Sequence, residues 1–471
     1  MTVAPLFSRN TLRARFLPAI ALSALAACGG GSGSSNSTAV SNTTSTPATA
    51  FTQSNPLATT DQNSLDQLAL QVNQDYPFTV LKAEAEAAYV AAHGLPVSSE
   101  ALARLGQDID ELAFSAIQKA VNNDPWHPKV YLVDAGPHNW FGLQIPGGRY
   151  SYDNPDNIYR TIPISGSLHY VIHGQRHSPG PADVTFSLIN NANSQGTVAV
   201  LSGSDLVLNA DGSYTITVDS DPANGRVNHI QSTSAAVQLF IRNNLGDWNT
   251  DTPDTLSVQL LDDASGQASL TEAEVATQAA LNLQESIVDY GVGALGVETM
   301  AHAVNTLSSP SQSSSLGTLT TQASSFGHWS ITDDQALVVT LNPGGAGYFV
   351  VPLTDPWMVT VDPGAYQLSL NEAQAQANAD GTYTFVIATQ DPGVYNWLST
   401  AGLHEGTAMV RWQDLPGTAP ASGGPSVTTQ VVALSALSTV LPAGTRMVTA
   451  AQRQQQLAER AAGYALRFDN P

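Results

Sequence analysis

The sequence predicts a mainly β protein with two related β-rich domains and helices at their flanks. A repeated segment carries this prediction: residues 209–242 and 378–411 have the same length, and six of their first eight residues are identical. In both copies an Asp-Gly turn is followed by alternating apolar and polar residues, the pattern of a half-buried strand. Because the copies begin roughly 170 residues apart, they indicate two domains and not a short-period solenoid. Stretches with helical spacing of apolar residues precede, separate and follow the copies.

The ends of the two copies also match. Both continue to an Asp-Pro pair, then to an asparagine (Asn228 and Asn396), and close on an arginine (Arg242 and Arg411). Residues that recur at the same place in two domains are expected to be structural. We therefore predict that each arginine binds carbonyl or carboxylate oxygens of the neighbouring Asp-Pro loop.

The composition argues against nucleic acid as a partner. Charged residues make up 12% of the 471 residues, and acids outnumber bases by 39 to 17, which gives a net charge of −22. Nucleic-acid binding depends on neutralising phosphates, so the sequence predicts no nucleic-acid partner. The acidic excess is typical of a surface that maintains solubility. A single cysteine, Cys28, excludes a disulfide within the chain.

Residues 1–27 have the features of an export signal. Basic residues (Arg9, Arg13 and Arg15) precede an apolar stretch at 16–27 that is too short to cross a bilayer. The small residues before Cys28 resemble the lipobox of bacterial lipoproteins. This resemblance implies cleavage before Cys28 and attachment of acyl chains such as palmitate to it. A plain secretory signal with an incidental cysteine is the alternative.

The resemblance to lipoproteins implies a lipid-anchored protein of the bacterial cell envelope, with the membrane as a partner. Gly29 stands where an aspartate often signals inner-membrane retention, so the outer membrane is favoured over the inner one. Residues 28–61 are rich in Gly, Ser, Thr, Asn and Pro, and this composition is typical of a flexible tether.

The other boundaries follow from changes in composition and periodicity. A helical segment is predicted over residues 62–125, where Leu105, Ile109 and Leu112 lie on one face. Capping boxes at Thr271 and Thr449 open two later helical segments. The predicted order is a first β domain at 126–265, connecting helices at 270–307, a linker rich in Ser and Gln, a second β domain at 326–445 and a C-terminal helix at 449–468.

Several short polar motifs stand out in the two β domains. They are Asn154-Pro155-Asp156-Asn157 with Tyr159-Arg160, the segment from Arg242 to Thr250, Asp355-Pro356-Trp357 and Asn396-Trp397-Leu398. Together they resemble the bacterial domain-of-unknown-function family 1214, over about residues 126–440 and most specifically in the C-terminal part. The resemblance implies β-sandwich, jelly-roll-like domains. It implies no reaction, because no activity of the family is known to us.

Two patterns that could indicate cofactors have simpler explanations. Gly291, Gly293 and Gly296 fit a dinucleotide-binding motif, but they lie in a helical stretch without the required preceding strand, so we expect close helix packing. His169, His173 and His177 are spaced by four, but β-branched and aromatic residues between them indicate a strand, on which they would be too far apart to share a metal. We therefore expect no cofactor and no metal.

Two groups of residues are candidates for a ligand site. The first group contains Asn154, Asp156, Asn157, Tyr159 and Arg160, with Arg160 as a clamp for an anionic or hydroxylated ligand. The second contains Asp355, Trp357, Asn396 and Trp397, which could stack a flat or sugar-like group and hydrogen-bond its edges. The alternative for the first group is a loop held by its own side chains, and for the second it is the architecture of the repeat.

The sequence favours a binding protein over an enzyme. No serine-hydrolase elbow, zinc-protease motif or paired cysteine motif occurs in the chain. The predicted function is binding of an extracellular glycan, polymer or apolar small molecule in an aromatic-lined cleft, within the second domain or between the two. The alternative is an envelope hydrolase that uses carboxylates such as Asp156 or Asp355 as acid or base.

Overall fold

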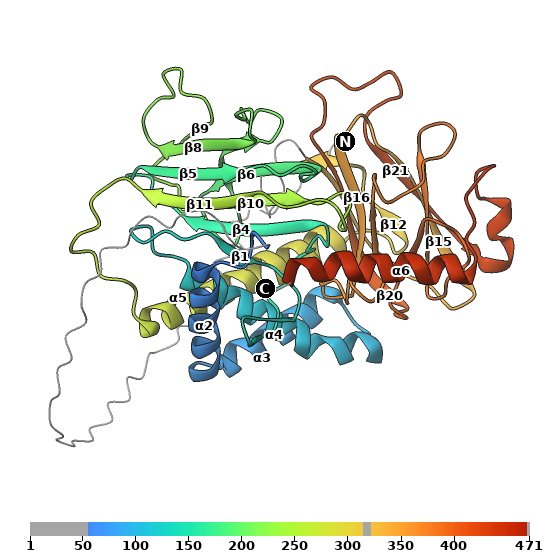
Figure 1. Ribbon diagram of the computed structural model, residues 1–471. Coiled ribbons are helices and arrows are strands. Elements are labelled where there is room, and N and C mark those ends of the chain that lie inside the picture. Colours follow the sequence, from blue (N-terminus) through green and yellow to red (C-terminus); the bar gives the residue numbers. More distant parts are fainter. Residues whose placement is uncertain (1–54, 314–321, 469–471) are drawn as a thin grey trace, which may run out of the picture. The chain divides into compact units, whose positions relative to one another are not determined.

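A computed structural model describes residues 55–313 and 322–468 (Figure 1). The predicted signal peptide, Cys28 and most of the tether therefore lie outside the described residues. The described chain contains two β-sandwiches accompanied by helices, which confirms the predicted fold class. Among the described helices, none is both long and apolar enough to span a membrane.

The first sandwich packs a five-stranded sheet on a four-stranded sheet. The five-stranded sheet has the order β1 (Tyr131–Val133), β4 (Asn157–Pro163), β10 (Gln238–Asn244), β6 (Asp183–Ile189) and β7 (Thr197–Ser202). The other sheet has the order β11 (Thr255–Leu260), β5 (Tyr170–Gln175), β8 (Ser213–Asp219) and β9 (His229–Gln231). Apolar side chains that alternate along these strands, including Ile172, Phe186, Ile216 and Ile241, form the core between the sheets.

The second sandwich has the same plan. Its larger sheet has the order β12 (Thr306–Leu307), β14 (Ala323–Ser330), β20 (Glu405–Gln413), β16 (Tyr348–Thr354) and β17 (Ser369–Asn371), and β13 (Ser311–Gln312) also pairs with β14. The other sheet has the order β19 (Trp397–Ser399), β18 (Tyr383–Ala388), β15 (Gln335–Asn342) and β21 (Ser426–Ala433). Strand β12 falls at the end of the stretch we expected to be helical, and β13 and the start of β14 fall in the expected linker, because strands of two residues leave no alternation in the sequence.

The internal repeat extends through both domains. Strands β4 to β11 and strands β14 to β21 occupy matching positions in the two sandwiches, in the same sequence order. Even the exceptions match, because the parallel pair of β8 and β9 has its counterpart in β18 and β19. The segment that repeats visibly in the sequence corresponds to only three strands of each domain, from the turn before β8 or β18 to β10 or β20.

The helices lie before, between and after the two sandwiches in the sequence, and two of them begin at the capping boxes predicted at Thr271 and Thr449. They are α2 (Thr60–Asp75), α3 (Thr79–His93), α4 (Ser99–Val121), α5 (Glu272–Ser286), the π-helix η1 (Ile287–Thr299) and α6 (Ala450–Ala465), with short 3₁₀ turns η2 (Leu434–Thr439) and η3 (Leu466–Phe468). Side chains of Ser98, Thr271 and Thr449 accept hydrogen bonds at the starts of α4, α5 and α6. Helices α2, α4 and α5 pack against the face of the five-stranded sheet that carries Tyr159 and Phe240, where a short hairpin of β2 (His138–Trp140) and β3 (Leu143–Ile145) also joins (Figure 1).

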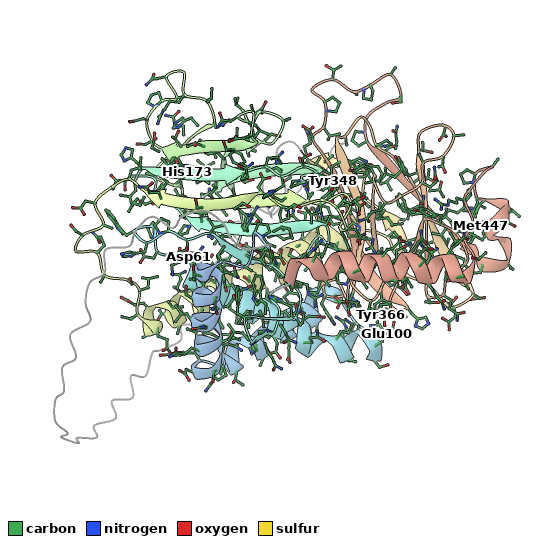
Figure 2. The ribbon with its side chains drawn as sticks, in the orientation of Figure 1. Asp61, Glu100, His173, Tyr348, Tyr366 and Met447 are labelled. Atoms are coloured by element: carbon green, nitrogen blue, oxygen red, sulfur yellow. The ribbon has the colours of Figure 1, made fainter. Side chains whose placement is uncertain are left out.

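The two patterns that resembled cofactor motifs are structural. At Gly291 of η1, a Cβ would lie 2.8 Å from the ring of Tyr89 on α3, so the glycine permits close packing of the two helices, as expected. His173 lies on β5 in the first sandwich (Figure 2), which confirms the expected strand. His169 instead contacts Asp262, with 3.2 Å between Nδ1 and Oδ1.

Candidate functional site

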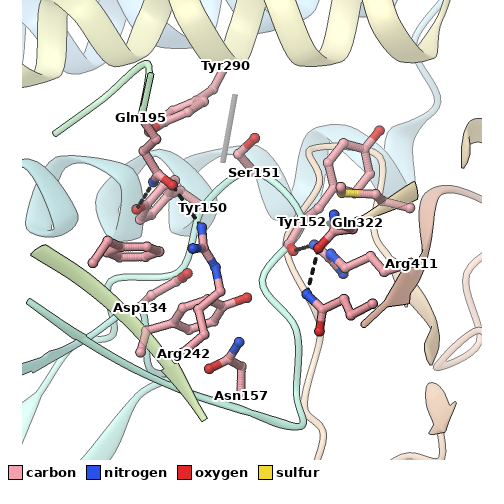
Figure 3. Close-up of a pocket in the computed structure, with 14 residues that line it drawn as sticks. Asp134, Tyr150, Ser151, Tyr152, Asn157, Gln195, Arg242, Tyr290, Gln322 and Arg411 are labelled. Carbon is pink, nitrogen blue, oxygen red and sulfur yellow. Dashed lines mark hydrogen bonds between the residues drawn. The ribbon is translucent and has the colours of Figure 1, made fainter. Parts of the chain in front are cut away.

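A small cavity lies between the two β domains (Figure 3). Its volume is about 40 Å³, measured as the space open to the centres of water-sized molecules. A single water needs roughly 10–15 Å³ by this measure, so the cavity has room for about three or four waters or for a small ligand. The residues that line it come from both sandwiches, from the segment before β4 and from η1: Asp134, Tyr150, Ser151, Tyr152, Asn157, Tyr159, Gln195, Phe240, Arg242, Tyr290, Gln322, Met409, Arg411 and Gln413.

The matching arginines of the repeat are both in this lining. Arg242 lies on β10, between β4 and β6, and Arg411 lies on β20, between β14 and β16. Both point away from their own sandwich cores, because the core residues Ile241 and Val410 precede them in the alternation. The repeat therefore presents one guanidinium from each domain to the same cavity.

The partners of the arginines differ from those we predicted. Arg242 donates to Ser187 Oγ at 3.3 Å and to Gln195 Oε1 at 3.2 Å. Arg411 donates from Nη2 to the carbonyl oxygen of Tyr152. The prediction that the arginines bind the Asp-Pro loops is wrong, since in the second domain Asp391 is instead paired with Arg453 at 2.9 Å.

One nitrogen of Arg411 has no partner. The residue is only 7% exposed, yet no described group accepts a hydrogen bond from its Nη1. Leaving a buried donor unsatisfied costs about 1–3 kcal/mol, and more for a charged group. Such a donor at the wall of a cavity indicates a place for an acceptor that the protein itself does not supply.

Burial shapes the electrostatics of the cavity. Desolvation lowers the pKa of Arg242, and the positive charge of Arg411 acts in the same direction. Desolvation raises the pKa of Asp134 well above its usual range, and the charge of Asp153 adds to the effect. In a chain with a net charge of −22, this cavity therefore combines two arginines with a carboxyl group that favours its neutral form.

Aromatic rings form much of the wall. Tyr150 and Tyr290 have ring centroids 4.9 Å apart, and the rings of Tyr159 and Phe240 stack at 5.6 Å. Gln195 Nε2 donates to the hydroxyl of Tyr150 at 3.2 Å, which fixes that ring. The aromatic-lined cavity between the domains is thus built from residues other than the tryptophans we singled out.

The backbone of the wall is unusual as well. Three non-glycine lining residues have positive φ: Asp134 at 57°, Ser151 at 44° and Tyr152 at 68°. A non-glycine residue in this region costs about 1–3 kcal/mol when the structure forces it there, and such residues cluster at ligand sites. The sequence does not predict the Tyr150-Ser151-Tyr152 segment as part of a site, because a loop conformation of this kind leaves no periodic pattern.

The structure divides the first candidate group. Asn157 and Tyr159 line the cavity, whereas Asn154, Asp156 and Arg160 are buried in hydrogen-bond networks that hold the domains. Arg160 donates to Asn243 Oδ1 at 2.6 Å and to the carbonyl oxygen of Asp254 at 2.5 Å, so it does not clamp a ligand there. The expected alternative, a loop held by its own side chains, applies to Asn154, which accepts from the amide of Asp156 at 3.1 Å.

Asp156 joins the two domains. Its carboxylate accepts hydrogen bonds from Trp248 Nε1 at 2.9 Å, from the Tyr348 hydroxyl at 2.6 Å and from Asn371 Nδ2 at 3.0 Å. Tyr348 and Asn371 belong to the second domain. Figure 2 shows Tyr348 at the side of the second sandwich that adjoins the first sandwich. Desolvation raises the pKa of Asp156 despite these donors. Asp156 is fully buried, and its role is to link the two domains by hydrogen bonds.

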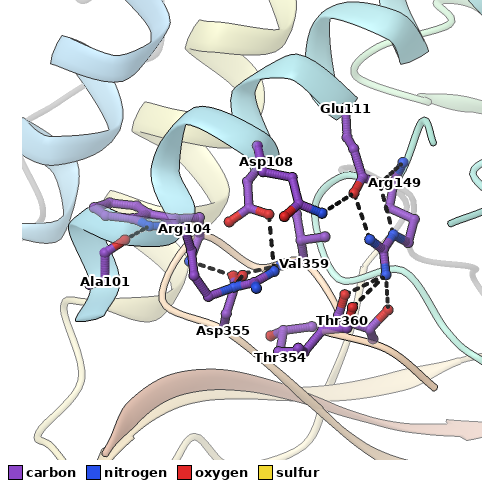
Figure 4. Close-up of polar contacts among 12 residues, drawn as sticks. Ala101, Arg104, Asp108, Glu111, Arg149, Thr354, Asp355, Val359 and Thr360 are labelled. Carbon is purple, nitrogen blue, oxygen red and sulfur yellow. Dashed lines mark hydrogen bonds and ion pairs between the residues drawn. The ribbon is translucent and has the colours of Figure 1, made fainter. Parts of the chain in front are cut away.

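Asp355 and Trp357 anchor helix α4 to the second domain (Figure 4). Asp355 accepts a 2.5 Å bond from Arg104 Nε, and its other oxygen accepts from the amides of Trp357 and Val359. Trp357 is buried among helices and donates from Nε1 to the carbonyl oxygen of Ala101 at 2.7 Å. Neither side chain lines the cavity.

The remaining two candidates also have structural roles. Asn396 binds both the amide and the carbonyl of Gln376, and Asn228 binds the amide and carbonyl of Val207 in the same way, so this pair belongs to the repeat. Trp397 donates to the carbonyl oxygen of Ala388 at 3.0 Å. Trp357 and Trp397 lie in separate hydrophobic clusters, and the structure does not bring them together in one cleft.

The comparisons with known proteins concern the fold. No protein-family model matches the chain, and no curated protein matches its sequence. The crystal structure of an uncharacterized protein from Burkholderia cenocepacia is similar, with a TM-score of 0.65 and 22% identity over 79% of this chain and 99% of that one. The VPA0106 protein from Vibrio parahaemolyticus gives a TM-score of 0.36 and 10% identity over 69% of this chain and 98% of that one. The first similarity shows that another bacterial protein has this fold.

Proposed function

We propose that this protein binds a small anionic molecule in the cavity between its two β domains. The observation that carries the proposal is the buried Nη1 of Arg411, which has no acceptor among the described residues although it lies at the cavity wall. A carboxylate or phosphate oxygen would supply that acceptor, and Arg242 adds a second positive charge in the same lining.

Two further features support a binding site over a packing defect. The wall contains five aromatic rings, from Tyr150, Tyr152, Tyr159, Phe240 and Tyr290, which suit the carbon skeleton of an organic anion. The positive φ angles of Asp134, Ser151 and Tyr152 hold the wall in a costly conformation, as ligand sites often do. The small volume favours a small molecule over a polymer or glycan chain.

Comparing the anion affinities of wild type and Arg411→Gln distinguishes a binding site from a cavity that binds no ligand. Titration calorimetry of the full-length protein with propionate and with phosphate should show saturable binding of at least one anion. Loss of the charged donor should weaken it at least roughly tenfold. Arg453→Gln is the matched control, because Arg453 is also buried and paired but does not line the cavity. Equal affinities of wild type and Arg411→Gln would refute the site.

We also propose that the protein is lipid-anchored through Cys28 in the bacterial envelope, with the outer membrane favoured, on the sequence features of residues 1–61. Its kinship with the domain-of-unknown-function family 1214 remains part of this proposal. A hydrolase is the weaker candidate, because Asp156 and Asp355 are fully buried and already engaged by protein donors.

A further inference from the structure

A second polar atom in the same lining has no partner. Asp134, directly after β1, is half-buried, but its Oδ1 is shielded from solvent and no described group bonds to it. Among the described lining residues, Arg411 Nη1 and Asp134 Oδ1 are the two side-chain atoms in this condition. Figure 3 shows Asp134 on the side of Arg242 and Arg411 on the opposite side. The two domains thus offer the cavity one unsatisfied donor and one unsatisfied carboxyl oxygen.

We propose that the ligand is a small hydroxycarboxylate, whose carboxylate binds Arg411 and whose hydroxyl group binds Asp134. This inference rests on the proposed function and names the ligand class. A planar carboxylate matches the fork of a guanidinium, and a hydroxyl group can both donate and accept, so it satisfies a carboxyl oxygen in either protonation state. Such a ligand would leave neither of the two buried atoms unpartnered.

The charges around Asp134 favour a hydroxyl group over an ammonium group. Lys119 and Asp134 together line a small adjoining cavity, and Lys119 Nζ lies 4.0 Å from the centre of the Tyr150 ring. The amine donates to Asn193 Oδ1 at 3.1 Å. With Lys119, Arg242 and Arg411 nearby, an amino acid would bring a fourth cation into a region of low dielectric constant.

The raised pKa of Asp134 also favours a hydroxyl group over an ammonium group. Desolvation raises its pKa well above the usual range, which favours the neutral carboxyl group, a donor as well as an acceptor. An ammonium group binds most strongly to a charged carboxylate, the form that burial disfavours here. Desolvation also lowers the pKa of Lys119 to about 7, so this amine is partly charged under the same conditions.

The test compares ligands that differ only at one group. Full-length protein is titrated by calorimetry with propionate, with lactate, which adds a hydroxyl group, and with alanine, which adds an ammonium group instead. Lactate should bind roughly tenfold more tightly than propionate, because the hydroxyl group satisfies a buried atom, and alanine should bind more weakly than both. Equal binding of lactate and propionate would overturn the inference but leave the anion site. Binding of neither would overturn the inference, and it would overturn the proposed function too if phosphate also failed to bind.

Variants at Asp134 test whether this residue contacts the hydroxyl group of the ligand. Asp134→Gly tolerates the positive φ and should lose the preference for lactate over propionate. Asp134→Asn also tolerates this conformation and should retain part of the preference, because its amide can still bond a hydroxyl group. Asp66→Asn is the control, since Asp66 is a buried aspartate that does not line the cavity. A full preference for lactate in Asp134→Gly would show that Asp134 is not the contact.

Discussion

Asn244 Nδ2 donates a 2.5 Å hydrogen bond to Gln413 Oε1, and the two residues hold equivalent places in the repeat. Each follows its arginine, Arg242 or Arg411, by two positions on the central strands β10 and β20. The two domains therefore meet through the same face of the same strand, as do the subunits of a dimer with an isologous interface. The cavity lies beside this contact because Arg242 and Arg411 are the next residues on that face.

We expect Asn244 and Gln413 to be energetically coupled. Asn244→Ala and Gln413→Ala should each lower the free energy of unfolding by about 1–3 kcal/mol, because each leaves buried polar partners unsatisfied. The double variant should lose less than the sum, with an interaction of about 0.5–3 kcal/mol. Urea unfolding of the four proteins measures this cycle. Strict additivity would mean that the contact does not hold the domains.

The tryptophans should matter for stability and the arginines for binding. Trp357→Ala removes a fully buried side chain and should cost about 3–5 kcal/mol in urea unfolding, while anion affinity of the folded fraction is retained. Arg411→Gln should show the reverse, with affinity lost and stability little changed, because it removes a buried charge whose Nη1 has no acceptor among the described residues. The sequence predicts the opposite, a structural role for the arginines and a ligand site at the tryptophans. Loss of binding in Trp357→Ala together with full binding in Arg411→Gln would support that assignment.

The fold was predictable where the two faces of a strand differ in exposure. Strand β8 alternates between buried Tyr214, Ile216 and Val218 and more exposed Ser and Thr residues, and this pattern is visible in the sequence. Strand β4 is buried along its whole length, and its polar residues bond to other protein groups, as Arg160 does to Asn243 and Thr161 does to Asn122. A sequence cannot distinguish a polar residue that faces water from one that faces a buried joint.

The site was only partly predictable for the same reason. The polar motif before β4 was noticed, and it contains two residues of the cavity, Asn157 and Tyr159. The sequence also singles out the repeated arginines, but their recurrence in both domains predicts a structural role. Their meeting in one cavity depends on how the domains pack, which no local pattern in the sequence records.

The lipid anchor is tested by labelling. In cells fed with radiolabelled palmitate, the wild-type protein should carry the label and fractionate with membranes, because several acyl chains give stable anchoring. Cys28→Ala should be unlabelled and either unprocessed or released. Equal labelling of both proteins would remove Cys28 as the site of acylation. A variant in the described domain such as Asp211→Asn, on an exposed turn, controls for expression.

Asp66 should make folding stability depend on pH. It is buried, and it accepts hydrogen bonds from Tyr131, Trp140 and Gln62, which tie α2 to β1 and β2. Desolvation raises its pKa from 3.8 to about 6. The folded protein therefore holds this proton more tightly than the unfolded chain does. The stabilisation that this group contributes is complete below about pH 4 and is lost as the pH rises through 6.

Comparison with Asp66→Asn isolates this effect. The variant cannot ionise there, and it should be less stable than wild type at pH 4, because one acceptor is replaced by a donor. Between pH 4 and pH 7 the gap should change in favour of the variant by up to about 3 kcal/mol, the value of roughly two pKa units. Urea unfolding at several pH values measures the gap. A constant difference across that range would mean that Asp66 ionises in the folded protein as easily as in the unfolded chain.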